Sequence, residues 1–418
     1  MKYSPTKNFL SWTIYCIAIG MCSLFFLHSD SIYTLSQSLA YLDGHFLDFY
    51  TFNTEKIGLV PYFPSVYIAL ALWSLPLKLL GLVDTSYISM WASSLPFNSI
   101  DHNQFSVLMI WFKLLLIILF FFSVKVTEKI SSQIPDNKVP NHLIFATSPF
   151  AIFSVFIFSG YDIFGILLTL LGFYFYLKDE LIKFSICFAF AITFKFFALI
   201  PFAPLLLLKE KSIPRIIIYG FMSISVSFIF ILIYHLDPSF FSNILYLVKN
   251  KVSVKGSINP STIIGVIGYI LLCFFAYFKR NLSKSMLVQN AIFVSYASYL
   301  ILFFVVKWHP QWILLPMPFL ALSYSYLKFR KISFYLEVIG FLAFLLLTFN
   351  TWKDNVDQKM LTDGPFGYFF QPYHFRIADI LNIHALDVFG INLKSVCILF
   401  LYLFLVHPLI LLFIGRRI

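Results

Sequence analysis

Apolar residues along this chain form long, nearly uninterrupted runs separated by short polar stretches. Runs of about 17–25 apolar residues are long enough to cross the hydrocarbon core of a bilayer as helices. The pattern therefore predicts an all-α, multi-pass membrane protein that forms a single domain over residues 1–418. The expected apolar segments are 9–27, 62–82, 105–124, 143–159, 163–177, 184–208, 215–234, 261–278, 288–306, 311–327, 332–350 and 395–414.

Lysine and arginine lie mainly in the short links between these runs. Because cytoplasmic loops carry an excess of these residues, their positions predict the sidedness of the chain. We expect both termini to be cytoplasmic. The clusters expected on that side are Lys2 with Lys7, Lys125 with Lys129 and Lys138, Lys178 with Lys183, Lys209 with Lys211 and Arg215, Lys279 with Arg280 and Lys284, Lys328 with Arg330 and Lys331, and Arg416 with Arg417.

Two apolar segments do not fit a simple count of crossings. Segment 184–208 begins and ends at basic clusters, so it must cross twice or dip into the membrane with Lys195 near its apex. Segment 62–82 contains Pro64 and Pro76, and we expect it to lie at the outer interface within a first external loop, 28–104. About 12 crossings then remain. The alternative is that 62–82 spans the membrane and the basic loop after the third run is external.

Composition agrees with a membrane protein and excludes an ordinary soluble domain. Hydrophobic residues make up 60% of the chain, charged residues 12%, and the mean hydropathy is +0.85. The net charge of +11 lies in loops that orient helices, so nucleic acid is not an expected partner. The five cysteines have no CxxC or metal-ligand spacing. The first apolar run lacks a small-residue cleavage site, so we expect it to be a retained helix.

Three ionisable residues stand out because charges inside or beside apolar segments are costly and often functional. Asp30 follows the first apolar run and is a candidate general base, although it could equally be a solvated loop carboxylate. Lys195 interrupts the run AFAITFKFFALIP, where its ammonium should either snorkel or meet an anion such as a lipid phosphate. Asp162 in SGYDIF fits a helix N-cap or a residue that positions the loop.

Other polar residues of the expected outer side are weaker candidates. His309 lies between two tryptophans in KWHPQW, a composition typical of the membrane interface. Lys249 and Lys251 lie outside against the positive-inside tendency, which an anionic head group or pyrophosphate would explain. Asp43 and Asp48 flank a histidine in LDGHFLDFY, so a divalent cation is an open but weak alternative there.

Taken in their order along the chain, these motifs resemble those of the GT-C integral membrane glycosyltransferases, in particular the GPI mannosyltransferases and the bacterial polyprenyl-phosphate-mannose-dependent enzymes. The matching motifs are Asp30-Ser-Ile-Tyr33, Gly44 to Tyr50, Tyr62-Phe-Pro64-Ser-Val-Tyr67, the block from SGYD to FKFFALIP with Asp162 and Lys195, and Lys307-Trp-His309-Pro-Gln311-Trp312; the basic stretch 249–261 matches more loosely. The resemblance covers residues 25–320, whereas 321–418, with an expected outer loop at 350–394, match no motif of the family.

The resemblance implies an inverting hexosyltransferase, with mannose as the first candidate sugar. It would move the sugar from a polyprenyl-phosphate donor to an envelope glycan or glycolipid on the extracytoplasmic face, in a bacterial plasma membrane. Asp30 would be the catalytic base. The implied substrate-binding residues are Tyr33, Asp162, Lys195, Lys249, Lys251, His309 and Gln311. The family's paired acidic motif is reduced here to Ser-Asp30-Ser, so no metal ligand is assigned.

Two other classes of membrane protein fit the sequence. A flippase or transporter of lipid-linked sugars would also use charges within the membrane, although its site is expected near the midplane. A polymerase or ligase of lipid-linked polysaccharides would use late outer-loop residues such as His374 and Arg376. Closeness of Asp30 and Lys195 in space would favour the glycosyltransferase.

Overall fold

A computed structural model of the protein describes residues 5–85, 102–252, 260–306, 309–352, 356–370, 387–388 and 391–414. These parts of the chain are almost entirely helical, and the two-residue strands β1 and β2 pair as a small antiparallel bridge. The α-helices are α1 (Pro5–Phe25), α2 (Ser29–Ser38), α3 (Phe49–Lys56), α4 (Pro64–Leu79), α6 (His102–Ser131), α7 (Asn141–Thr147), α8 (Pro149–Ile152), α9 (Ile163–Leu177), α10 (Leu181–Phe194), α11 (Leu199–Lys209), α12 (Ile213–Tyr234), α13 (Phe240–Val252), α14 (Pro260–Phe278), α15 (Lys284–Val305), α16 (Met317–Ser323), α17 (Arg330–Trp352), α18 (Lys359–Thr362) and α20 (Leu393–Ile414). The tighter or wider turns are η1 (Leu39–Tyr41), the π-helix η3 (Phe153–Ile157), η4 (Phe196–Ala198), η5 (Pro310–Leu314) and η7 (Gly367–Phe370), and the strands are β1 (Asp387–Val388) and β2 (Ile391–Asn392).

Five of the described helices are long and apolar enough to cross a membrane: α6, α12, α15, α17 and α20. The end of α1 and the helix that follows it form a sixth candidate, but the two are bent by 71°. Shorter apolar helices, including α4, α9, α10 and α11, account for most of the remaining apolar runs. The expectation of an all-helical, multi-pass membrane protein agrees with these helices.

Two of the expected segments are broken, and one of the two breaks has a local cause in the sequence. Segment 143–159 is divided at Ser148, whose extended backbone precedes Pro149, because proline disfavours helical geometry in the residue before it. Segment 184–208 is divided at Lys195, which has φ −153° and ψ 115° between α10 and η4. The second break is where the sequence places an ionisable residue within an apolar run.

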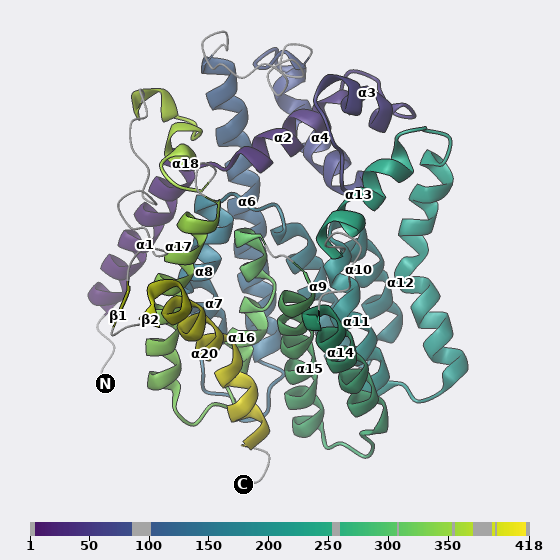
Figure 1. Ribbon diagram of the computed structural model, residues 1–418, viewed down its shortest axis with the longest axis vertical. Helices are drawn as coiled ribbons and strands as arrows, with labels where there is room; N and C mark the ends of the chain where they lie inside the picture. Colours follow the sequence, from purple (N-terminus) through teal and green to yellow (C-terminus); the bar gives the residue numbers. More distant parts are fainter. Residues whose placement is uncertain are drawn as a thin grey trace.

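The first long link of the chain forms a group of short helices at one end of the bundle. In Figure 1, α2, α3 and α18 lie at the upper end, whereas the C-terminal end of α20 and the link between α14 and α15 lie at the lower end. α4 packs against α2, η1, α6 and α10. Asp237 accepts hydrogen bonds from the backbone N–H of Tyr50 at 2.8 Å and from the hydroxyl of Thr51 at 2.6 Å, so α3 is anchored to the segment that follows α12.

Aromatic side chains fill the interior between the helices. Phe150 and Phe404 stack with ring centroids 4.8 Å apart, which joins α8 to α20. A Cβ at Gly340 would lie 2.7 Å from the Cβ of Phe404, so glycine allows the close approach of α17 and α20. The many phenylalanines are therefore largely packing residues that hold the helices together, and they position the few polar groups described next.

Candidate functional site

A buried ion pair joins the beginning of α9 to the end of α10. The Nζ atom of Lys195 lies 2.5 Å from Oδ1 of Asp162, and the two side chains are only 5% and 1% exposed. α9 and α10 are antiparallel neighbours that pack against each other, so the N-terminus of α9 lies beside the C-terminus of α10. Two of the three ionisable residues singled out in the sequence are therefore direct partners.

Three aromatic rings surround the ammonium of Lys195. Its Nζ atom lies 4.6 Å from the ring centroid of Tyr62, 5.5 Å from that of Tyr161 and 5.7 Å from that of Trp312. The rings of Tyr62 and Tyr161 also meet edge to face at 5.6 Å. Electron-rich ring faces stabilise a desolvated cation, by about 2 kcal/mol each in favourable cases. The structure therefore holds Lys195 with one carboxylate and an aromatic cage.

Asp162 is placed by its backbone as an N-cap but does not cap the helix. It occupies the N-cap position of α9, yet its side chain makes no capping hydrogen bond. Its carboxylate instead faces Lys195. Of the two roles expected for Asp162, the N-cap is therefore wrong, because pairing with a buried ammonium competes successfully for the carboxylate.

The turn before Asp162 is closely packed on both sides. Ser159 has a positive φ of 68°, and the N–H of Gly160 donates to the carbonyl of Ser154 at 2.7 Å. A Cβ at Gly160 would lie 2.9 Å from that carbonyl oxygen and 3.2 Å from the Cβ of Gln311. Gln311 is buried, and no hydrogen-bond partner for its Oε1 occurs among the described residues. The close packing fixes the turn, and the buried carbonyl oxygen of the Gln311 side chain lies beside it as a hydrogen-bond acceptor.

Asp30 is a partly exposed carboxylate in the first turn of α2. Its side chain is 44% exposed, and Oδ2 lies 3.7 Å from Nδ1 of His28. The same imidazole nitrogen accepts a hydrogen bond from the backbone N–H of Asp30 at 3.1 Å, so His28 caps the helix. His28 is itself buried and stacked on Phe158 with centroids 3.9 Å apart. Water and polar ligands can therefore reach Asp30 beside a fixed imidazole.

Hydrogen bonds connect the helix that carries Asp30 to the turn that carries Asp162. The hydroxyl of Ser31 donates to the carbonyl of Ser159 at 2.7 Å. The hydroxyl of Thr34 lies 3.2 Å from the hydroxyl of Tyr161, a member of the cage around Lys195. The candidate base and the buried pair thus belong to adjoining elements.

The other expected site residues are not all part of this cluster. Tyr33 lies on α2 and is partly exposed. The ring of His309 lies 5.1 Å from that of Trp312 and 4.4 Å from that of Trp352. Lys249 and Lys251 lie in α13, but their side chains are outside the described part of the structure, as are all atoms of His374 and Arg376.

The acidic residues later in the first link have local partners. Asp43 forms an ion pair with Lys78 at 2.9 Å, and Asp48 lies 2.9 Å from Nδ1 of His45. Asp43 also accepts a hydrogen bond from the hydroxyl of Thr85. Within the described ranges, no three His, Cys, Asp or Glu side chains are grouped closely enough to hold a metal ion. These contacts support the fold of the link.

Lys113 is a buried cation that the sequence reasoning missed. It lies within α6, is almost fully buried, and donates from Nζ to the backbone carbonyl of Phe156 at 2.7 Å. That carbonyl belongs to the π-helix that leads into the Gly160 turn. The signal was present, because Lys113 interrupts the expected apolar segment 105–124 just as Lys195 interrupts 184–208.

Comparisons of this chain with protein-family models, with curated proteins and with solved structures found no match. The chemistry of the site must therefore be inferred from its own residues. They combine an accessible carboxylate with a buried ammonium, its counterion and a cage of aromatic rings. Such a set can accept a proton and stabilise an anion.

Proposed function

We propose that this protein is a GT-C-type membrane glycosyltransferase that moves a hexose from a polyprenyl-phosphate sugar to an envelope glycan or glycolipid. Mannose is the first candidate sugar. The observation that carries the proposal is the connection of Asp30, through Ser31 and Ser159, to the turn holding the Asp162–Lys195 pair. Transfer of a sugar with phosphate as the leaving group requires a base for the acceptor hydroxyl and a cation for the phosphate, and here the two lie on adjoining elements.

In this proposal Asp30 is the general base. An acceptor hydroxyl attacks the anomeric carbon while the bond from that carbon to the phosphate oxygen breaks, and the acceptor proton passes to Asp30. The product is inverted at the anomeric carbon, and polyprenyl phosphate leaves. Partial exposure of the Asp30 side chain supports this role, because an acceptor must reach the carboxylate. His28 holds the backbone of Asp30 in position.

The proposal gives Lys195 the task of stabilising the phosphate. Asp162 neutralises the ammonium while no donor is bound and keeps it from withdrawing from the site. A donor phosphate would then share the ammonium with Asp162. Trp312 and Gln311 of η5, together with His309 just before it, would complete the binding surface.

The proposed topology has about twelve crossings, both termini in the cytoplasm and the reaction on the extracytoplasmic face of a bacterial plasma membrane. α2, α3 and α4 would be juxtamembrane helices of the first outer link. Two observations support this arrangement: α4 has only 16 residues, and α2 is sharply bent away from α1. The basic links are on the opposite side in this topology.

A transporter or flippase of lipid-linked sugars is the second candidate. It is favoured by the break at Lys195, because transporters often place charged groups where membrane helices are discontinuous. The two functions differ in covalent chemistry. A transporter leaves the donor intact, whereas the proposed enzyme splits it into sugar and polyprenyl phosphate.

The test uses the full-length protein purified in detergent. It is incubated with polyprenyl-phosphate mannose carrying a labelled sugar and with mixed membrane glycolipids as acceptors. We expect labelled sugar in the glycolipid fraction and release of polyprenyl phosphate, both lost in Asp30→Asn. An intact donor with this and other polyprenyl-phosphate hexoses, together with transport in proteoliposomes, would refute the glycosyltransferase and support the transporter.

A further inference from the structure

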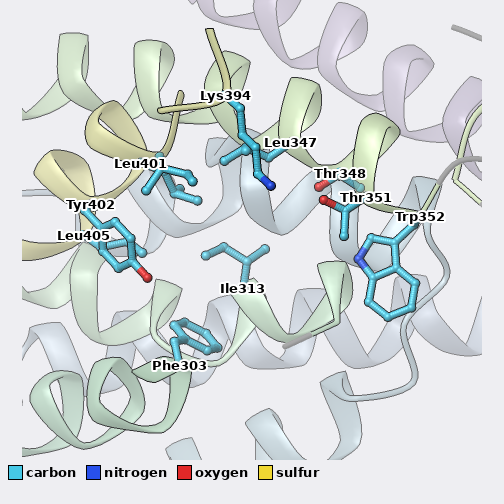
Figure 2. A pocket seen from close by; sticks show the side chains of 11 residues that line it. Phe303, Ile313, Leu347, Thr348, Thr351, Trp352, Lys394, Leu401, Tyr402 and Leu405 are labelled. Atoms are coloured by element: carbon cyan, nitrogen blue, oxygen red, sulfur yellow. The ribbon is translucent and has the colours of Figure 1, made fainter. Parts of the chain in front are cut away.

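A cavity lies among the C-terminal helices, outside the region of the Asp162–Lys195 pair. Its volume is about 230 Å³, and it opens between α15, η5, α17 and α20. Figure 2 shows the side chains that line it, including Phe303, Ile313, Leu347, Trp352 and Lys394. The sequence patterns gave no function to this part of the chain.

Most of the cavity wall is apolar. Phe303, Ile313, Leu401 and Leu405 come from three different elements and enclose the space. An apolar cavity of about 150 Å³ stays dry and binds small hydrocarbons. The present cavity is larger and is formed in part by α17 and α20, which are long and apolar enough to lie in a membrane. Its walls favour a hydrocarbon chain over water.

Three polar groups lie together on one side of this cavity, and the hydroxyl of Tyr402 lies apart from them. In Figure 2, the ammonium of Lys394 and the hydroxyls of Thr348 and Thr351 lie on one side, and Phe303 lies across from them. The Thr348 side chain is 1% exposed, and its hydroxyl has no hydrogen-bond partner among the described residues. This buried hydroxyl is an unsatisfied polar group at the wall of a cavity.

The same side of the cavity is positively charged. Lys394 is the second residue of α20, so its ammonium adds to the positive end of the helix dipole. Within the described residues, no carboxylate pairs with Lys394, and none lines the cavity. A cation and an unsatisfied hydroxyl beside an apolar space match an anion attached to a hydrocarbon chain.

We propose that this cavity binds a membrane lipid with a phosphate head group. The phosphate would contact Lys394 and the hydroxyls of Thr348 and Thr351, and one hydrocarbon chain would fill the apolar part. The site is distinct from the Lys195 cage, although η5 touches both: Trp312 faces Lys195, and Ile313 lines the cavity. This inference does not rest on the proposed glycosyltransferase activity.

Native mass spectrometry of the full-length protein in a neutral detergent tests the proposal. The probes are phosphatidylglycerol, undecaprenyl phosphate and, as a zwitterionic reference, phosphatidylcholine of matched chain length. We expect at least one anionic probe to bind about fivefold more tightly than phosphatidylcholine, the effect of one lysine on an anionic head group. Whether the phospholipid, the isoprenoid phosphate or both show this preference identifies the source of the phosphate.

Variants assign the preference to the cavity. These variants are made in the Lys195→Met/Asp162→Leu background, so that polyprenyl phosphate held at the Lys195 cage does not contribute. In that background Lys394→Gln should abolish the preference for the anionic probe, and Lys394→Arg should retain it. Leu401→Trp should fill the cavity and reduce tight binding of every probe. Lys284→Gln is the matched control, because Lys284 also lies in the first turn of a long apolar helix but does not line the cavity.

Three results would overturn the proposal. One is an equal affinity of the wild-type protein for all three probes. The others are an unchanged anionic preference in Lys394→Gln and unchanged tight binding in Leu401→Trp. Melting curves of each variant show that it is folded before binding is compared, and Lys394 is an exposed residue whose substitution leaves the core intact.

Discussion

The ammonium of Lys195 and the carboxylate of Asp162 lie 2.5 Å apart, enclosed by apolar helices and three aromatic rings. Each group alone would be costly in this environment, because a desolvated charge loses its interaction with water. Together they satisfy one another and hold the break between α10 and η4 against the start of α9. The pair is therefore a structural link and, within the described ranges, the one buried ion pair beside the candidate base.

Removing one member of this pair should destabilise the protein strongly. Lys195→Met leaves the Asp162 carboxylate buried without a cation, which typically costs about 3–5 kcal/mol. The double variant Lys195→Met/Asp162→Leu has no buried charge and should melt at a higher temperature than Lys195→Met. Thermal unfolding in detergent measures both. A double variant that is less stable than Lys195→Met would show that the two side chains are not coupled.

The same double variant separates the structural role of Lys195 from its proposed role toward phosphate. If Lys195 stabilises the donor phosphate, the folded double variant should need about tenfold more polyprenyl-phosphate sugar for half-maximal rate, equal to about 1.4 kcal/mol of lost binding. The half-saturating donor concentration is the measurement. A wild-type value in a folded double variant would assign Lys195 to structure alone.

Asp30→Asn should lower sugar transfer by about two to four orders of magnitude, because the amide retains the size of the side chain but cannot accept the acceptor proton. Asp48→Asn is the matched control, since it removes an exposed carboxylate that contacts His45 in the same link. Initial rates at saturating donor give the comparison. Equal rates for Asp30→Asn and wild type would exclude Asp30 as the base.

The proposed sidedness predicts where introduced cysteines react. Asp84→Cys, which follows α4, should react with a membrane-impermeant maleimide added from outside intact cells. Asn281→Cys, in the basic link between α14 and α15, should react only after the cells are opened. Both are made in a background in which the five natural cysteines are replaced by serine. The reverse labelling pattern would show that the topology is inverted relative to the proposed one.

Asp363 should make stability depend on pH. It lies between α18 and η7, where burial raises its pKa from 3.8 to about 7. The folded protein therefore binds more protons than the unfolded chain between these values, so this residue lowers stability as pH rises from about 4 to 7. Asp363→Asn should be more stable than wild type at pH 8, by at most about 4 kcal/mol, with a smaller difference at pH 5. A difference that is the same at both pH values would contradict this.

Much of the fold is determined by local properties of the sequence. Apolar runs of membrane length predict helices, because a backbone in hydrocarbon must satisfy its own hydrogen bonds. The break at Ser148 also has a local cause, the proline that follows it. The charge of Lys195 does not by itself explain the break at that residue, because Lys113 lies within the continuous helix α6. The free-energy cost of placing a charge within a membrane segment was sufficient to single out Asp162 and Lys195 as candidate residues.

The partners of these residues were decided by tertiary structure. Nothing within SGYDIF indicates that Asp162 faces Lys195 instead of capping α9, because that choice depends on the antiparallel packing of α9 and α10. The cavity beside Lys394 is likewise built from helices far apart in the sequence. Hydrophobicity and chain length act locally and can be read along a sequence. Pairing of charges and enclosure of space depend on distances that exist only after the helices have packed.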